Sequence, residues 1–188
     1  REDGFVYDDG VIARLAEDRF HVTTTTGGAP RVLHMMEDYL QTEWADLQVW
    51  LTSTTEQWSV IAVQGPKARE VIAPLVNGLD VSNAALPHMS MVRGALGDIP
   101  MLLMRVSFTG ELGYEINVPA GYGQRAWGLV WAAGQAYGMT PYGTATMHVL
   151  HRSRGRLRHT GPGAAFWFRP MSAAISDSLA EPRSAGRR

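Results

Sequence analysis

The sequence contains no cysteine among its 188 residues, so it has no disulfide, no cysteine–metal site and no thiol nucleophile. It contains one lysine, and no apolar run approaches the roughly 18–20 residues of a membrane span. It also opens without the apolar block of a secretory signal peptide. These absences lead us to expect a cytoplasmic protein without membrane association.

What is present is a globular composition, with 45% hydrophobic and 19% charged residues, which excludes disorder of the whole chain. The charges are divided unevenly. Residues 1–150 hold 9 Lys and Arg against 16 Asp and Glu, whereas residues 151–188 hold 8 Arg against 2 acidic residues. The net charge of −1 and the single lysine argue against nucleic-acid binding. We expect one domain over residues 1–150 and a basic tail over residues 151–188.

Short apolar segments at alternating and at helical spacing predict both strands and helices. Pro30 suits the first turn of a helix, because proline has no N–H to lose there. This order of elements predicts an α+β fold with a mostly antiparallel sheet and split βαβ, or ferredoxin-like, elements. The expected strands lie at residues 11–13, 20–22, 47–51, 60–63, 89–92, 101–106 and 114–118, and the expected helices follow Pro30, follow Pro66 and span about 122–137.

Two acidic residues and a threonine run are the first candidates for chemistry. Asp8 and Asp9 are adjacent, so in extended chain their carboxylates point to opposite sides and only one enters a given site. Such a carboxylate could accept a proton or hold an N–H donor of a ligand, although solvated turn acids are the commoner interpretation. Hydroxyls of residues 23–26 could also meet a ligand, or serve only strand propensity and capping.

Residues 107–115 join two expected strands through Gly110 and Gly113. Glu115 begins the second strand, where its carboxylate could reach into a cleft, but a surface glutamate in a glycine-rich hairpin is the simpler interpretation. This glycine spacing is not a phosphate-binding fingerprint, because it joins two strands and opens no helix. The six histidines show no metal-ligand spacing, so we expect no metal site.

Taken together, four motifs resemble the aminomethyltransferase family, which includes the T-protein of the glycine cleavage system. Further stretches resemble more specifically the C-terminal, folate-binding part of the α subunit of heterotetrameric sarcosine oxidase. The resemblance implies an aminomethyltransferase-like folate-binding domain, present here incompletely. The four motifs lie at residues 2–9, 17–20, 62–68 and 109–115, and the further stretches at residues 21–28, 36–42, 50–58 and 142–150.

The resemblance also implies roles for particular residues. Asp9 is the position that lies near folate N10 and the transferred one-carbon unit in the family, so it is the expected catalytic residue. Glu115 is the position that contacts the pterin ring. Phe108 replaces a tyrosine of the T-protein and keeps its stacking surface, and Thr24 and Thr25 are further candidates for folate binding. The T-protein's arginine in a Gly-Ala-Arg-Asp motif has no counterpart in residues 143–146.

The function implied is one-carbon capture. Flavin-dependent oxidation of sarcosine, elsewhere in a complex with other sarcosine oxidase subunits, would give an imine, and tetrahydrofolate bound here would take its one-carbon unit as 5,10-methylenetetrahydrofolate. Flavin and NAD sites are expected only in other parts of that complex. Two alternatives stay open: a stand-alone aminomethyltransferase or demethylase-like enzyme, and a non-catalytic folate-fold module that binds a partner.

The tail departs from the pattern that the resemblance implies after Leu150. One permitted coding of residues 153–160, read from its second base, gives Arg-Glu-Gly-Gly-Tyr-Val-Ile, close to the expected continuation of the family. We therefore expect residues from about His151 to be a frameshifted, disordered translation in which residues 166–168 are poorly packed. The alternative is a genuine basic tail that binds nucleic acid or membrane.

Overall fold

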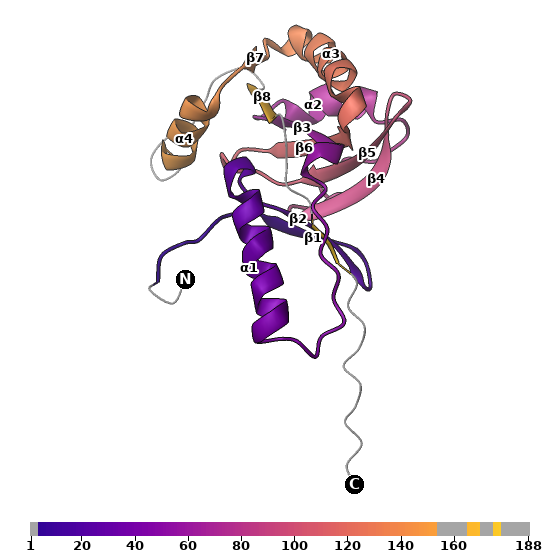
Figure 1. Ribbon diagram of the computed structural model, residues 1–188. Helices are drawn as coiled ribbons and strands as arrows, with labels where there is room; N and C mark the ends of the chain where they lie inside the picture. The colour runs from indigo at the N-terminus through magenta and orange to yellow at the C-terminus, as the bar shows by residue number, and fades with distance from the viewer. Residues whose placement is uncertain (1–3, 154–164, 170–174, 178–188) are drawn as a thin grey trace. The chain divides into compact units, whose positions relative to one another are not determined.

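The computed structural model describes residues 4–153, 165–169 and 175–177 (Figure 1). The chain divides into two compact units, one formed by residues 1–57 with 171–188 and the other by residues 58–170. Each unit combines helices with antiparallel strand pairs, which confirms the predicted α+β class.

The first unit contains a three-stranded sheet and one long helix. Strands β1 (Val11–Ala16) and β2 (Arg19–Thr23) pair antiparallel, and β2 also pairs antiparallel with β9 (Ile175–Asp177). After a short 3₁₀ turn, η1 (Thr26–Gly28), the helix α1 (Ala29–Thr42) begins with proline in its first turn. Both expected strands and the helix expected after Pro30 are therefore confirmed.

The strand expected at residues 47–51 is wrong. This stretch is irregular, and the next regular element is the 3₁₀ turn η2 (Thr55–Gln57). Leu47 is 36% exposed and Trp50 62% exposed. An alternating pattern becomes a strand only where one face is covered and a neighbouring strand supplies hydrogen bonds. The face expected to be buried carries Leu47, which is exposed, and Val49 and Leu51, which are only half-buried.

The second unit contains a six-stranded sheet in the order β4-β5-β6-β3-β8-β7. The neighbouring strands pair antiparallel, except β7 and β8, which are parallel. The strands are β3 (Trp58–Gln64), β4 (Ser90–Leu96), β5 (Ile99–Arg105), β6 (Gly113–Pro119), β7 (Thr140–Pro141) and β8 (Ala165–Arg169). The helices are α2 (Ala68–Ile72), α3 (Gly123–Gly134) and α4 (Thr144–Ser153), with 3₁₀ turns η3 (Ala73–Leu75), η4 (Ala120–Tyr122) and η5 (Gln135–Tyr137).

The hydrophobic core of the second unit lies between one face of this sheet and the helices α2 and α3, which cover that face (Figure 1). Alternate residues of β3, β5 and β6 supply it, among them Ile61 of β3, Leu103 of β5 and Ile116 of β6, all 0% exposed. Each such side chain contributes about 1.5–3 kcal/mol by burial. The intervening residues of β6, Glu115 and Asn117, therefore point to the opposite face of the sheet.

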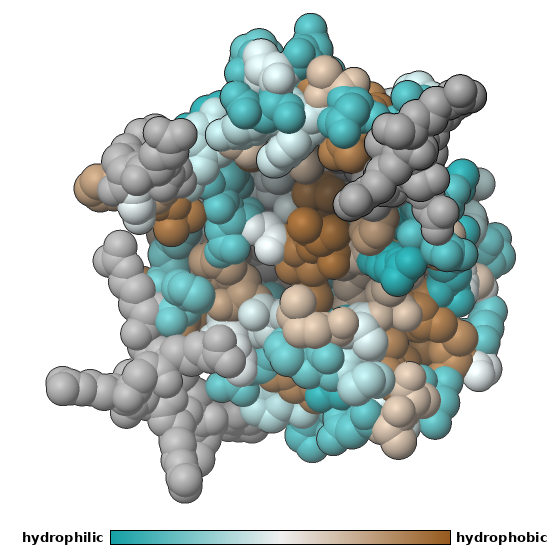
Figure 2. Space-filling model, turned by 90° about the horizontal axis from the view of Figure 1, so that it is seen from below, coloured by the Kyte–Doolittle hydropathy of each residue, from teal (hydrophilic) through white to brown (hydrophobic). Residues whose placement is uncertain are grey.

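Several large hydrophobic side chains reach the surface, and Figure 2 shows such hydrophobic residues, in brown, among hydrophilic ones on one face. Most of them belong to the first unit. Among the described helices, none reaches the length and apolar character that crossing a membrane requires. The exposed large hydrophobic residues of the first unit are Phe5, Val6, Ile12, Tyr39, Trp44, Leu47 and Trp50.

Most of the tail lies outside the described residues. Of residues 151–188, the structure describes the end of α4, the strand β8 and the strand β9. The expected boundary at residue 150, the expected disorder and the expected frameshift therefore stay predictions. The packing of residues 166–168 also lies outside what the structure describes, because the side chains of β8 are not among the described features.

Candidate functional site

The carboxylate of Asp8 is fixed by a network of donors in the first unit. The backbone N–H and the hydroxyl of Thr25 each donate to it at 2.9 Å, and the backbone N–H of Asp9 donates at 2.9 Å. Arg31 adds an ion pair at 3.4 Å, and the Asp8 side chain is only 8% exposed. Asp8 therefore ties the segment before β1 to the turn that begins α1.

This network decides the charge of Asp8. Burial disfavours the charged carboxylate, but the hydrogen bonds from Thr25, Asp9 and Arg31 outweigh it and hold the pKa of Asp8 below its ordinary value. Asp8 is therefore a fixed negative charge at neutral pH. It accepts hydrogen bonds within the protein and has no proton to donate to a ligand.

Asp9 has different surroundings from Asp8. It is exposed, and within the part of the chain that the structure describes its carboxylate takes part in no hydrogen bond or ion pair. Its backbone N–H, in contrast, is held by Asp8. The two adjacent carboxylates therefore differ: Asp8 is turned into the fold and Asp9 is exposed, and a catalytic role of Asp9 stays a prediction.

Gly28 and Arg31 were not singled out from the sequence, yet both shape the surroundings of Asp8. A Cβ atom on Gly28 would overlap Oδ2 of Asp8, so only glycine permits this approach. Arg31 donates to the backbone oxygen of Tyr7 at 2.7 Å, and its guanidinium lies 4.5 Å from the centre of the Tyr7 ring. In the sequence, this position is marked by the glycine pair at 27 and 28, which by itself predicts only a break between two secondary-structure elements.

The two candidate threonines lie on the turn that holds Asp8. Thr24 is buried, and its hydroxyl donates to the backbone oxygen of Thr25 at 2.9 Å. The hydroxyl of Thr25 donates to Asp8 and accepts from the N–H of Gly28 at 3.2 Å. Thr25 is therefore the N-cap of η1, and folate contacts by either threonine stay a prediction.

In the second unit, Gln64 at the end of β3 anchors the loop between β5 and β6. Its side-chain oxygen accepts from the hydroxyl of Ser107 at 3.4 Å, and from both the backbone N–H and the hydroxyl of Thr109. The hydroxyl of Ser107 also accepts from the N–H of Gly110 at 2.9 Å. Because Phe108 lies between two anchored residues, its backbone is held in place although it belongs to a loop.

The ring of Phe108 is half-buried and takes part in two aromatic contacts with α4. The imidazole of His151 stacks on it, with ring centroids 4.2 Å apart and planes 19° apart. His148 meets it edge-on at 6.1 Å. A ring nitrogen of His151 also lies 2.6 Å from the backbone oxygen of Phe108. Phe108 thus stacks on a flat side-chain heterocycle in this structure, and its stacking on folate stays a prediction.

Glu115 lies on β6 opposite Ala62 of β3 and Met104 of β5, on the sheet face away from α2 and α3. Its side chain is half-buried. Its charge acts on Tyr142, which the sequence did not single out: burial first, and the charge of Glu115 second, raise the pKa of Tyr142 to about 12. A half-buried carboxylate and a neutral phenol supply one hydrogen-bond acceptor and one donor.

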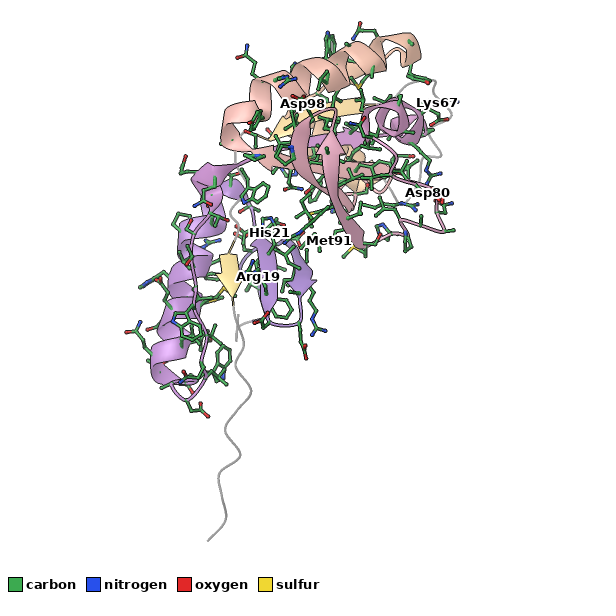
Figure 3. All side chains as sticks on the ribbon, turned by 90° about the vertical axis from the view of Figure 1, so that its right-hand side faces the viewer. Arg19, His21, Lys67, Asp80, Met91 and Asp98 are labelled. Carbon is green, nitrogen blue, oxygen red and sulfur yellow. The ribbon has the colours of Figure 1, made fainter. Side chains whose placement is uncertain are left out.

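Histidines and acidic residues do not assemble into a metal centre in the described part of the chain, where no three His, Asp or Glu side chains are grouped to bind a metal ion. His21 of β2, labelled in Figure 3, is buried at 4% exposure. Burial lowers its pKa to about 4, so this imidazole is neutral at physiological pH.

Comparison with known proteins places the chain in a family. Residues 1–171 match the family described as the GCVT N-terminal domain. The chain belongs to this family. The resemblance expected from the motifs is therefore confirmed, and the α+β architecture is consistent with this family.

Individual relatives of this GCVT-family chain carry two names. Sarcosine oxidase subunit alpha of Corynebacterium sp. (strain P-1) is 54% identical over 156 residues, which cover 82% of this chain and 16% of that protein. The protein of the same name from Rhizobium meliloti (strain 1021) is 44% identical over 161 residues, covering 85% of this chain and 16% of that protein. An aminomethyltransferase of Corynebacterium aurimucosum is 32% identical over 157 residues, covering 82% of this chain and 41% of that protein.

The sequence of this GCVT-family chain thus spans about a sixth of the sarcosine oxidase subunits it matches. Its expected site residues fall in both units. Asp9, Thr24 and Thr25 belong to the first, whereas Phe108 and Glu115 belong to the second. Within the second unit, the structure adds Tyr142 to Glu115 and His151 to Phe108.

Proposed function

We propose that this chain is the tetrahydrofolate-binding portion of a sarcosine oxidase α subunit, where the one-carbon unit from sarcosine oxidation is captured as 5,10-methylenetetrahydrofolate. The observation that carries the proposal is the 54% identity to a protein named sarcosine oxidase subunit alpha, against 32% to an aminomethyltransferase. We further propose that the imine is produced by other parts of the complex, with other subunits as partners.

The described side chains of the second unit suit a pterin ring. A pterin is a flat heterocycle with N–H donors on its edge, and the half-buried carboxylate of Glu115 can accept from such donors. Phe108 offers an aromatic surface whose backbone is fixed by its anchored neighbours. The buried hydroxyl of Tyr142, without a hydrogen-bond partner among the described residues, is one further polar group that a ligand could satisfy.

In the first unit, Asp9 is proposed to handle protons at the folate nitrogens. When bound, tetrahydrofolate would take the one-carbon unit between N5 and N10, while its two N–H protons pass to the nitrogen that leaves as glycine. An exposed carboxylate can accept such a proton and pass it on, and its charge favours a cationic imine. Asp8 fixes the backbone of Asp9 through the hydrogen bond to its N–H. Thr24 and Thr25 are proposed as further folate contacts.

Glu115→Ala tests the binding half of the proposal. Loss of a hydrogen bond between a pterin N–H and a charged carboxylate should weaken tetrahydrofolate binding by about 1–3 kcal/mol, measured by tryptophan fluorescence titration. Glu111→Ala is the matched control, because Glu111 is an exposed glutamate of the same segment and its loss should leave the affinity unchanged. Equal affinity of the Glu115 variant and the wild-type protein would contradict the assignment.

Asp9→Ala tests the catalytic half, in the full-length protein that contains this sequence. Formation of methylenetetrahydrofolate should be abolished while sarcosine oxidation continues, because the variant removes a proton acceptor and leaves the oxidation site intact. Asp18→Ala, in the exposed turn between β1 and β2, is the control. An unchanged yield of methylenetetrahydrofolate from the Asp9 variant would rule out its role and favour a non-catalytic binding module.

A further inference from the structure

Tyr142 follows β7 and precedes α4, and its hydroxyl is the buried end of the side chain. Among the described residues nothing donates to or accepts from this hydroxyl. Buried hydroxyl groups are nearly always hydrogen-bonded in folded proteins, because burying a hydroxyl without a hydrogen-bond partner costs free energy. A buried hydroxyl without a partner is therefore a group that a ligand can complete.

Tyr142 lies at the same level of the six-stranded sheet as Glu115. Glu115 pairs with Ala62, Ala62 pairs with Trp167 of β8, and Tyr142 directly follows Pro141, the partner of the residue before Trp167. Burial, and after it the charge of Glu115, raise the pKa of Tyr142 to about 12, so the phenol keeps its proton at neutral pH. Tyr142 can then donate a hydrogen bond, while Glu115 can only accept. The two side chains together present one donor and one acceptor.

A ligand that complements one donor and one acceptor at the same level of the sheet carries an acceptor and a donor on one flat ring, as a cyclic amide does with its C=O and N–H. The pterin ring of tetrahydrofolate carries such a pair. We propose that Tyr142 is a pterin-recognition residue that donates its O–H to the ring carbonyl while Glu115 accepts from a ring N–H. This inference rests on the proposed function and adds to it a specificity-determining residue.

A purely structural role for Tyr142 makes a different prediction. If the hydroxyl served the fold, its removal would destabilise the protein. If it is held for a ligand, removal deletes a buried polar group without a partner, so the melting temperature should stay the same or rise. The affinity for the ligand should fall at the same time.

The experiment compares Tyr142→Phe with Tyr122→Phe, which removes a hydroxyl from a tyrosine of the same unit that is 42% exposed. Dissociation constants are measured for tetrahydrofolate and for p-aminobenzoylglutamate, the part of the ligand that lacks the pterin ring. For tetrahydrofolate we expect a roughly 5- to 10-fold weaker affinity with Tyr142→Phe, the ratio for one hydrogen bond, and no change with Tyr122→Phe. Binding of p-aminobenzoylglutamate should be the same in all three proteins.

Each other outcome has a separate meaning. Equal affinity of wild-type and Tyr142→Phe for tetrahydrofolate would overturn the inference and leave the proposed function standing. A lower melting temperature, with equal losses for both ligands, would overturn it in favour of a structural role. Absence of tetrahydrofolate binding by the wild-type protein would overturn the proposed function, and this inference with it.

Discussion

Asp8 and His21 show how burial acts on two ionisable residues of the same unit with different results. The carboxylate of Asp8 keeps its charge because Thr25, Asp9 and Arg31 surround it with donors. His21, in contrast, loses its charge: burial lowers its pKa to about 4, so the imidazole is neutral at pH 7. The donors around a buried group, and not its burial alone, therefore decide its charge.

His21 should make the stability of the chain depend on pH. Its pKa is about 4 in the folded protein and 6.5 ordinarily, so between these values the unfolded chain binds more protons. Stability is then complete above pH 6.5 and is lost as the pH falls toward 4, by about 2 kcal/mol between pH 7 and pH 5. In urea unfolding experiments, the free energy of unfolding of His21→Gln should fall by about 2 kcal/mol less between pH 7 and pH 5 than that of the wild-type protein. His34→Gln, at an exposed position of α1, should behave like the wild-type protein.

The sequence predicts those site residues whose motifs are contiguous, and it misses those that interact with residues far away in the chain. The Asp8–Asp9 pair, the threonine run and the loop carrying Phe108 and Glu115 are contiguous motifs, visible without the fold. The charge of Glu115 acts on Tyr142, 27 positions away, because both residues belong to the same six-stranded sheet or its immediate end. Gln64 likewise anchors a loop more than 40 positions later. No local pattern contains either interaction.

At the scale of single elements, the turn from β2 into α1 depends on one close approach. The backbone of Gly28 has φ −87°, which any residue can adopt, so its requirement for glycine comes from the overlap that a Cβ would make with Asp8. The neighbouring Gly27 has nothing within 4 Å of the same position. These adjacent glycines form a matched pair for testing whether the Asp8 network stabilises the turn.

Gly28→Ala should destabilise the protein by roughly 1–3 kcal/mol, because Asp8 or the turn must move to admit the methyl group. Gly27→Ala should be neutral or stabilise by about 0.4–1 kcal/mol, because it restricts the unfolded chain without a clash. Denaturant unfolding measures both free energies. Equal effects of the two substitutions would show that Asp8 tolerates displacement and that its hydrogen bonds contribute little to the turn.

Elements with strong local signals were predictable, whereas one with a weak signal was not. The run of four apolar residues in β3 and the proline in the first turn of α1 are strong local signals, and both elements are present. The alternation at residues 47–51 is a weaker signal than a continuous apolar run, and it does not form a strand. The difference lies in tertiary surroundings: β3 has a paired strand on each side, whereas Leu47, on the expected buried face of residues 47–51, is 36% exposed.

At the scale of the whole molecule, apolar burial is distributed unequally between the units. Every residue of the hydrophobic core cluster lies between Ile61 and Met139, in the second unit. In the described part of the first unit, the only buried hydrophobic residues are Ala13, Ala29 and Val32. Because burial of apolar surface is the main favourable term in folding, the first unit has the smaller stabilisation of its own.

Native-state hydrogen exchange should therefore separate the two units. Strands β2 and β3 are both paired antiparallel on each side, so their amides are matched in hydrogen bonding and differ in the core beneath them. We expect the amides of His21 and Val22 to exchange through opening of the first unit, at least 10-fold faster than those of Ile61 and Val63, which report unfolding of the larger core. The factor of 10 corresponds to about 1.4 kcal/mol between the two opening free energies. Equal protection of β2 and β3 would mean that the chain opens as one cooperative unit, in which the small core of the first unit is stabilised by more than its own buried side chains.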